Sequence, residues 1–118
     1  MAISDEINKK ISNLFGGFSK LNRAERFERL LQMGALTNED AKFLKSGSKV
    51  DIELAEKFIE NVIGFFQMPL GVAANFVINK KAYVIPMAVE ETSIIAAASK
   101  TAKWINQHGT IQTETVGR

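Results

Sequence analysis

The chain contains no cysteine and only one histidine among its 118 residues, and both shortages exclude whole classes of site. Without cysteine there is no disulfide framework and no thiolate to act as a nucleophile or ligand. One histidine cannot supply the Cys and His ligands of a structural zinc site, so we expect no bound metal. The glycine-rich loops that hold nucleotide phosphates are missing too, since the sequence has neither a GxGxxG pattern nor a Walker loop.

Long apolar runs and strong net charge are also lacking. No stretch reaches the roughly 20 apolar residues of a membrane span, and the best candidate, Ala82 to Ala98, is broken by Glu90 and Glu91. The first residues are acidic and polar before Lys9 and Lys10, which is the wrong order for a secretory signal. A net charge of +2 gives no indication of a nucleic-acid partner. We therefore expect a soluble cytoplasmic protein that binds neither membrane nor nucleic acid.

Residues 1–60 have the pattern of short helices, each preceded by a residue that can cap its first turn. The caps are Ser4, Asn22, Thr37 and Asp51, and Glu25 can complete a capping box with Asn22. Helical spacing predicts which apolar side chains face inward. These are Ile7, Ile11, Leu14, Phe15, Phe27, Leu30, Leu31, Phe43 and Leu44, together with a stripe of Ile52, Ala55, Phe58, Ile59 and Val62.

After position 60 the pattern changes to strands. The apolar runs Gly71–Ile78 and Ala82–Val89 are joined by Asn79-Lys80-Lys81, which predicts a β-hairpin. Ser93–Gln107 predicts an alanine-rich helix, and Thr110–Val116 alternates like the start of a strand that the terminus cuts off. Helices, then a hairpin, then a helix and a strand indicate an α+β fold. Because a two-stranded hairpin is marginal alone, its strands need further cover.

Glu90 and Glu91 lie between the second apolar run and the alanine-rich helix. Adjacent side chains in extended backbone point to opposite faces, so only one of the two can face a given pocket. A structural interpretation is that acidic residues before a helix complement its dipole. A functional one is that apolar neighbours favour the neutral form of one carboxyl group, which could then donate a proton. Periodicity does not decide between them. The neighbours are Val84, Ile85, Met87, Val89, Ile94 and Ile95.

Two other polar features also have both a structural and a functional interpretation. Glu60 and Asn61 are typical of a solvated helix end, or they orient a ligand or a neighbouring subunit. The small residues within 68–76 would let a ligand approach the backbone, or would let a strand pack closely. His108 lies at the end of the predicted helix, where a cation is ordinary, and we assign it no catalytic role.

A basic run on the second predicted helix could line a phosphate-binding face. It could equally be a solvated helix face, because acidic residues interleave with it and can pair with it. The basic residues are Lys20, Arg23, Arg26 and Arg29, and the acidic ones are Glu25 and Glu28.

Three segments together resemble one enzyme family. They are Glu60-Asn61-Val62-Ile63-Gly64, Pro69 through Phe76 with Ile78-Asn79, and Val89-Glu90-Glu91-Thr92-Ser93 through Ser99. Over most of its length, the chain resembles the N-terminal part of hydroxymethylglutaryl-CoA (HMG-CoA) reductase, specifically the bacterial class II form. The resemblance implies an oxidoreductase that interconverts HMG-CoA with mevalonate and CoA, using two NADH or NADPH.

The resemblance also implies roles for individual residues. Glu91 matches the family's catalytic glutamate, which protonates the carbonyl oxygen as hydride arrives. Ser93 matches a position that touches the hydroxymethylglutaryl group, and Asn61 and Lys20 are further substrate-binding candidates, Lys20 only by an offset match near the CoA phosphate. The segment Glu60–Gly64 matches one near the subunit interface, which implies a homodimer or larger homo-oligomer with a shared active site.

The departures from the family pattern matter as much. The family's catalytic lysine, aspartate and histidine belong to segments that this chain does not contain, and His108 does not match that histidine. Thr92 replaces the proline that commonly follows the catalytic glutamate, which costs some rigidity. By resemblance, 1–60 is an N-terminal helical region and 61–118 is the first segment of a larger substrate-binding domain, ending near the entry to an absent NAD(P)-binding domain.

We therefore expect an N-terminal part of a reductase that is inactive alone, with NAD or NADP bound outside it. The alternative is a stand-alone interaction module, in which the helical half binds a partner protein and the two glutamates merely cap a helix.

Overall fold

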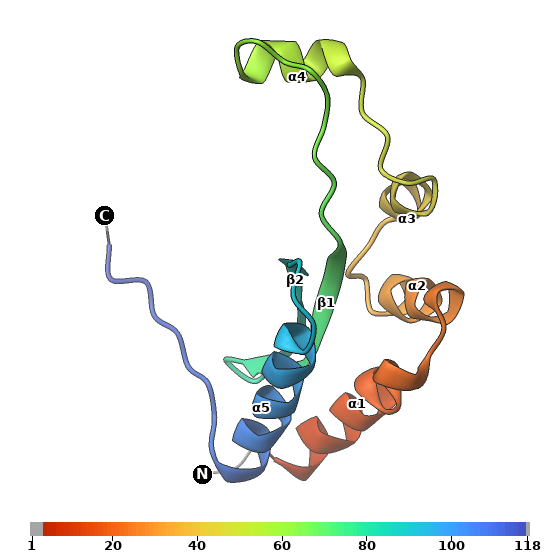
Figure 1. Cartoon of the computed structure of the whole chain (residues 1–118). Coiled ribbons are helices and arrows are strands. Elements are labelled where there is room, and N and C mark those ends of the chain that lie inside the picture. The colour runs from red at the N-terminus through yellow and green to blue at the C-terminus, as the bar shows by residue number, and fades with distance from the viewer. Residues whose placement is uncertain (1–3, 118) are drawn as a thin grey trace.

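The computed structural model describes residues 4–117 and has the α+β architecture that the sequence predicts (Figure 1). The N-terminal half is helical and the C-terminal half consists of a hairpin followed by a long helix. The elements are α1 (Asp5–Phe15), a single 3-10 turn η1 (Phe18–Lys20), α2 (Arg23–Gln32), α3 (Asn38–Lys45), α4 (Ile52–Phe58), β1 (Leu70–Ile78), β2 (Lys81–Ala88) and α5 (Ile94–His108).

The four predicted caps occupy the N-cap positions of α1 to α4, and three of them make side-chain capping hydrogen bonds. The Ser4 side chain accepts a hydrogen bond from the Ile7 N–H, and Asn22 forms the expected capping box with Glu25. Thr37 forms a second capping box, with Asp40, which the sequence analysis did not anticipate. Asp51 precedes α4 but makes no side-chain capping hydrogen bond. That helix therefore lacks the local stabilisation of the others.

The hairpin pairs β1 with β2 in antiparallel register, and Ile78 lies opposite Lys81. The two residues between them, Asn79 and Lys80, both have positive φ (51° and 66°), as a type I′ turn requires. Between Ala73 and Phe76 the register shifts, so β1 contains a bulge. Asn75 lies within the bulge with φ 70°, a left-handed conformation that asparagine tolerates better than most residues.

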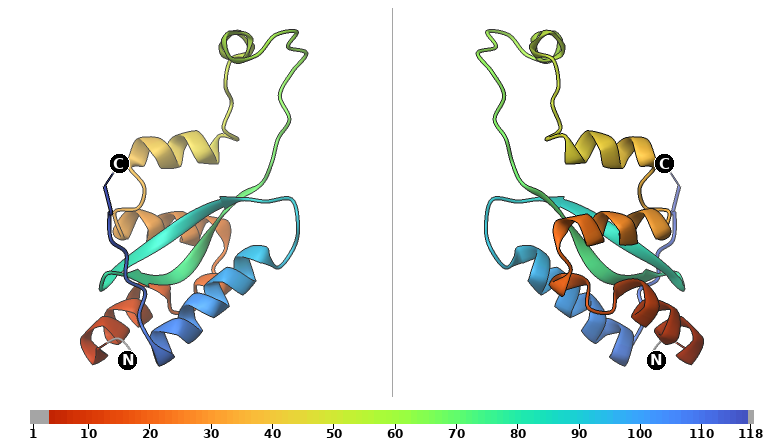
Figure 2. Two further views of the ribbon diagram at one scale, coloured as in Figure 1. Left: turned by 90° about the vertical axis from the view of Figure 1, so that its left-hand side faces the viewer. Right: turned by 90° about the vertical axis from the view of Figure 1, so that its right-hand side faces the viewer.

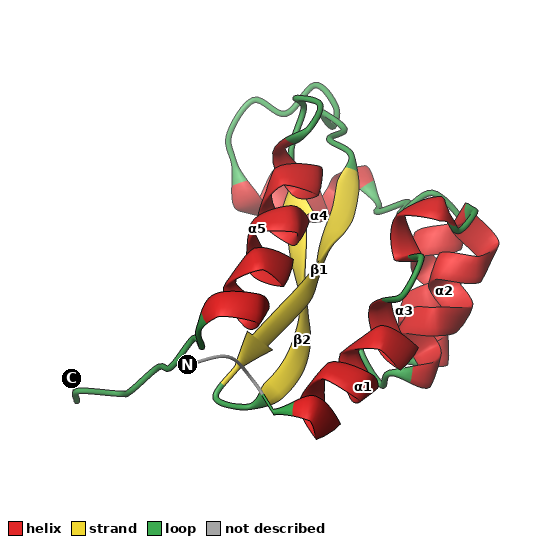
Figure 3. Ribbon diagram, turned by 90° about the horizontal axis from the view of Figure 1, so that it is seen from below, coloured by secondary structure: helices red, strands yellow, loops and turns green. Residues whose placement is uncertain are grey.

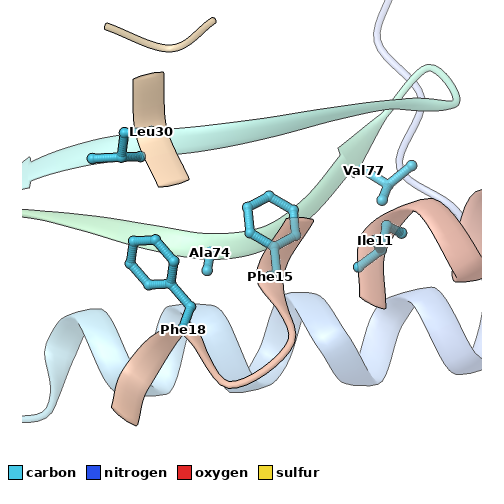
Figure 4. Close-up of a cluster of buried hydrophobic side chains, with 6 residues drawn as sticks. All are labelled: Ile11, Phe15, Phe18, Leu30, Ala74 and Val77. Carbon is cyan, nitrogen blue, oxygen red and sulfur yellow. The ribbon is translucent and has the colours of Figure 1, made fainter. Parts of the chain in front are cut away.

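One hydrophobic core joins the N-terminal helices to the hairpin. It is made by Ile11, Phe15, Phe18, Leu30, Ala74 and Val77 (Figure 4). Helix α5 packs along β1, and viewed from below the hairpin lies between α5 and the α1–α2 pair (Figure 3). The hairpin is thus covered on both faces, which is what a two-stranded sheet needs in order to persist in water.

Residues 46–69, which we call the arm, extend away from this core and carry α4 (Figures 1 and 2). Its large apolar side chains are exposed: Phe58 by 74%, Phe66 by 88%, and Ile63 fully. The predicted apolar stripe is only partly helical, because α4 ends at Phe58 and Ile59 is extended with φ −139°. Only Ala55 of the stripe is buried.

Two further predictions were wrong. Phe43 was expected to face inward, but it is 44% exposed, because α3 is a short helix that packs mainly on α2 and not on the hydrophobic core. The segment from 110 to 116 was expected to form a strand, but it makes only an isolated parallel bridge between Ile78 and Ile111.

Candidate functional site

The loop between β2 and α5 carries Glu90, Glu91 and Ser93. It is tied to the end of the arm, because the Val89 N–H donates to the Pro69 carbonyl at 3.2 Å. The carboxyl group of Glu91 was expected to be shielded by apolar residues, but Glu91 is exposed, and so is Glu90. One of the apolar neighbours, Ile95, packs against Gly71 of β1. Residues 4–117 therefore leave the side chain of Glu91 exposed to solvent.

Ser93 has the least ordinary backbone conformation in this loop. It occupies the N-cap position of α5 with φ 74°, in the left-handed region where a serine is uncommon. Its carbonyl accepts the Ala97 N–H at 2.8 Å, but its side chain makes no capping hydrogen bond. A serine held in a costly conformation without using its hydroxyl group as a cap is a candidate for a functional contact.

The small residues of β1 allow close packing, at Gly71 against α5 and at Ala74 in the hydrophobic core. A Cβ atom built on Gly71 would lie 2.6 Å from Ile95 Cδ1, so the glycine lets the helix approach the strand. Ala73 and Ala74 are buried on successive positions of the same strand. Residues 70–76 therefore form part of a packed strand, while Met68 to Val72 also line the hollow described below.

A polar network fastens α5 to the bulge of β1. The Ala74 N–H donates to Ser99 Oγ at 2.9 Å, and Asn75 Nδ2 donates to the Ser99 carbonyl at 3.2 Å. Asn106 Nδ2 donates to the Asn75 carbonyl at 2.7 Å, while the buried Asn106 Oδ1 has no partner among the described residues. Sequence reasoning missed this network, although Ser99 and Asn106 lie seven residues apart on one helix face.

An open hollow of about 1260 Å³ lies between the α2–α3 pair and the two ends of the arm. Its wall combines cations with large apolar side chains, among them Arg23, Arg26, Lys49, Phe65, Phe66 and Met68. Arg23 also donates to the Leu44 carbonyl at 2.9 Å and lies over the Phe27 ring at 5.0 Å, so it helps to hold α2 against α3.

The basic run divides between structural and exposed positions. Arg29 donates to the Leu14 carbonyl at 2.8 Å and is partly buried, so its role is structural. Lys20 ends the 3-10 turn, is exposed and does not line the hollow. Only Arg23 and Arg26 of the run reach the hollow.

The segment Glu60-Asn61-Val62-Ile63-Gly64 lies at the far end of the arm, away from the start of α5 (Figure 1). Glu60 and Asn61 are exposed, Asn61 has φ 56°, and Val62 is partly buried. Within one chain the two segments that contain the glutamate motifs are therefore separated (Figure 1).

Two exclusions hold for residues 4–117. No group of three or more His, Asp or Glu side chains is placed to hold a metal ion. None of the described helices combines the length and the apolar character that crossing a membrane requires. His108 is the last residue of α5 and stacks on Trp104 with ring centroids 4.3 Å apart.

Comparison with known proteins identifies close relatives. Residues 23–118 match the family model of hydroxymethylglutaryl-coenzyme A reductase. A 3-hydroxy-3-methylglutaryl-coenzyme A reductase from Archaeoglobus fulgidus is 40% identical over 114 residues, which cover 97% of this chain and 26% of that protein. A class II reductase from Streptococcus pneumoniae, solved bound to NADPH in open conformations, matches with a TM-score of 0.78 and 31% identity. The match covers 88% of this chain and 28% of that one, so the chain spans about a quarter of its relatives' length.

Proposed function

Because this chain belongs to the hydroxymethylglutaryl-coenzyme A reductase family, we propose that it supplies the proton donor of a class II reductase. The donor is Glu91, which gives its proton to the thioester carbonyl oxygen of HMG-CoA as the carbonyl carbon is reduced. The observation that supports this role is the position of Glu91: it is accessible, two residues before the unusual Ser93, in a loop that is fixed to Pro69.

The exposure of Glu91 sets a condition on this chemistry. A carboxyl group donates a proton only from its neutral form, and apolar, water-poor surroundings favour that form. Since Glu91 is exposed on the isolated chain, bound substrate or another protein surface has to close over it before the reaction. Excluding water would also protect the reduced intermediate.

Ser93, Asn61 and Lys20 are the proposed substrate contacts. The Ser93 hydroxyl, which is not used as a cap, would bind the hydroxymethylglutaryl group. The arm segment that contains Asn61 lies away from the start of α5 (Figure 1), so Asn61 would act in the site of a second copy. Lys20 is exposed at the end of the 3-10 turn and would pair with a CoA phosphate.

The cofactor, NAD or NADP, does not fit the residues of this chain. The sequence has no glycine-rich phosphate loop, and we assign no step of the nicotinamide chemistry to its residues. In this proposal 1–60 is an N-terminal helical region and 61–118 is the first segment of the substrate-binding domain. The cofactor would be held by residues outside this segment.

A chimera tests the role of Glu91. This chain would replace the matching quarter of the S. pneumoniae reductase, and NADPH oxidation with HMG-CoA would be measured. Glu91→Gln should lower kcat by about 10²- to 10⁴-fold, the usual contribution of a general acid. Glu90→Gln, which removes the adjacent exposed carboxylate, is the matched control and should retain activity. Near-normal turnover by the Glu91→Gln chimera would refute the assignment.

The second part of this proposal is that the chain forms a homodimer through the arm. Exposed apolar residues gathered on one projecting segment are typical of an interaction surface, and Phe58, Ile63 and Phe66 are exposed together there. The segment Glu60–Gly64 would then meet a second copy. The same exposure also suits the alternative function, a module that binds a different protein. Mixing two differently labelled samples of this chain, with no other protein present, distinguishes the two, because only homodimerisation brings the labels together.

A further inference from the structure

The tip of the hairpin holds the segment that follows α5. The Asn79 N–H donates to the Ile111 carbonyl at 3.0 Å, next to the parallel bridge between Ile78 and Ile111. The side chain of Asn79 then makes two more hydrogen bonds to one residue. Its Oδ1 accepts the Thr113 N–H at 2.8 Å, and its Nδ2 donates to Thr113 Oγ1 at 2.7 Å. We call this set of three hydrogen bonds the Asn79 clip.

In the clip, the side chain of Asn79 continues the hydrogen bonding of β1 beyond the end of the strand. β1 ends at Ile78 because the chain turns back there, so no backbone remains to pair with residues beyond Ile111. The carboxamide of Asn79 has the donor and acceptor of a peptide group. It presents them where the next peptide of β1 would have been, and Thr113 binds to it.

We propose that Asn79 is a positioning residue that fixes the direction in which the chain leaves α5. Residues 110–113 are held as part of the hairpin body, and Thr113 is the last residue so held. The direction of the backbone is therefore fixed as far as Thr113, and it can change only after this residue. This assignment is independent of the role of Glu91, because it concerns a different end of the hairpin.

Asparagine at this position also has a simpler explanation. The first central residue of a type I′ turn needs positive φ, and asparagine is favoured there for that reason alone. Asn79→Gly separates the two roles. Glycine satisfies the turn at least as well, but it removes both side-chain hydrogen bonds to Thr113.

Amide hydrogen exchange on the full chain provides the first measurement. In Asn79→Gly the Thr113 amide should exchange at least about tenfold faster, the factor expected for losing its hydrogen bond. Amides paired between β1 and β2 should keep their wild-type rates. Thr113 exchange at the wild-type rate, with an intact hairpin, would overturn the proposal.

A distance measurement provides the second. The chain has no cysteine, so Lys103→Cys and Val116→Cys can be spin-labelled specifically on the outside of α5 and beyond the clip. The wild-type background should give a narrow distance distribution and Asn79→Gly a broad one.

One further variant covers the case in which Asn79→Gly disturbs the hairpin. Thr113→Pro deletes the N–H on the other side of the clip and leaves both turn residues unchanged. It should broaden the same distance distribution. A distribution as narrow as that of the wild type would show that the clip does not direct the segment.

Discussion

Ser99 Oγ accepts a hydrogen bond from the backbone N–H of Ala74 at 2.9 Å, so a side chain of α5 satisfies a peptide group in the bulge of β1. Ala74 is buried, and the bulge takes this N–H out of the pairing with β2. The hydroxyl group of Ser99 therefore replaces a missing strand partner. Through this bond the bulge helps to determine where α5 lies, and with it where the loop of Glu91 ends.

Ser99→Ala should destabilise the chain by about 2 kcal/mol, because it leaves a buried N–H without an acceptor. Urea unfolding followed by circular dichroism measures the change. Ser12→Ala makes the same replacement at an exposed position of α1 and should change stability by only a few tenths of a kcal/mol. Equal effects of the two variants would contradict this account of the bulge.

Gly71→Ala should cost about 1–3 kcal/mol through overpacking, because its Cβ would lie 2.6 Å from Ile95 Cδ1. Ile95→Val removes that methyl group and alone should cost about 1 kcal/mol. The double variant should be less destabilised than the sum of the two changes, and thermal unfolding of all four proteins gives the coupling. Strict additivity would mean that the two side chains do not meet.

Acid should weaken the second capping box through Asp40. The backbone N–H of Thr37, and after it the Thr37 side chain, lower the pKa of Asp40 from its ordinary value of 3.8. A pKa that is lower in the folded state stabilises the fold above the unfolded pKa, and this contribution is lost as the pH falls through 3.8 toward the folded value. The stability difference between wild type and Asp40→Asn should therefore shrink below about pH 5. Glu39→Gln is the control, and a difference that stays constant with pH would argue against the effect.

Ile63→Asp should weaken self-association by at least about tenfold, since it places a charge on the most exposed apolar residue of the arm. Sedimentation equilibrium over a range of concentrations measures it. Ser19→Asp adds the same charge at an exposed position of the body and should leave association unchanged. A compact wild-type monomer at every concentration would rule out the arm as a homodimer surface.

The purified 118-residue chain should oxidise no NADPH in the presence of HMG-CoA. Its sequence contains no nucleotide-binding loop, and Glu91 lies in solvent. Absorbance at the NADPH band follows the reaction, with the S. pneumoniae enzyme as the positive control. Steady turnover by the chain alone would show that the family's chemistry can be completed by these residues.

The local features of the fold were predictable from the sequence. Ser4, Asn22 and Thr37 mark helix starts because a cap acts within three residues of itself. Asn79 and Lys80 mark the turn for the same reason, since only their own backbone has to adopt positive φ.

What depends on contacts between distant residues was not predictable. The burial of Phe43 is decided by what packs on α3, and residues 4–117 leave its side chain 44% exposed. The bulge network joins Asn75 to residues 24 and 31 positions away, which no periodicity reveals. The candidate site was anticipated only in part for the same reason: the sequence singles out Glu91, but the exposure of its side chain depends on which distant residues pack near it.

The hydrophobic core can hold the two halves of the chain together even when the backbone between them is cut. Ile11 and Phe15 in α1 pack with Ala74 and Val77 in β1, while the arm between them runs through solvent. Continuity of the backbone is thus not what holds the two halves together. A protease that nicked the arm would leave fragments still joined by their shared interior, and the halves could be expressed as separate peptides that reassemble.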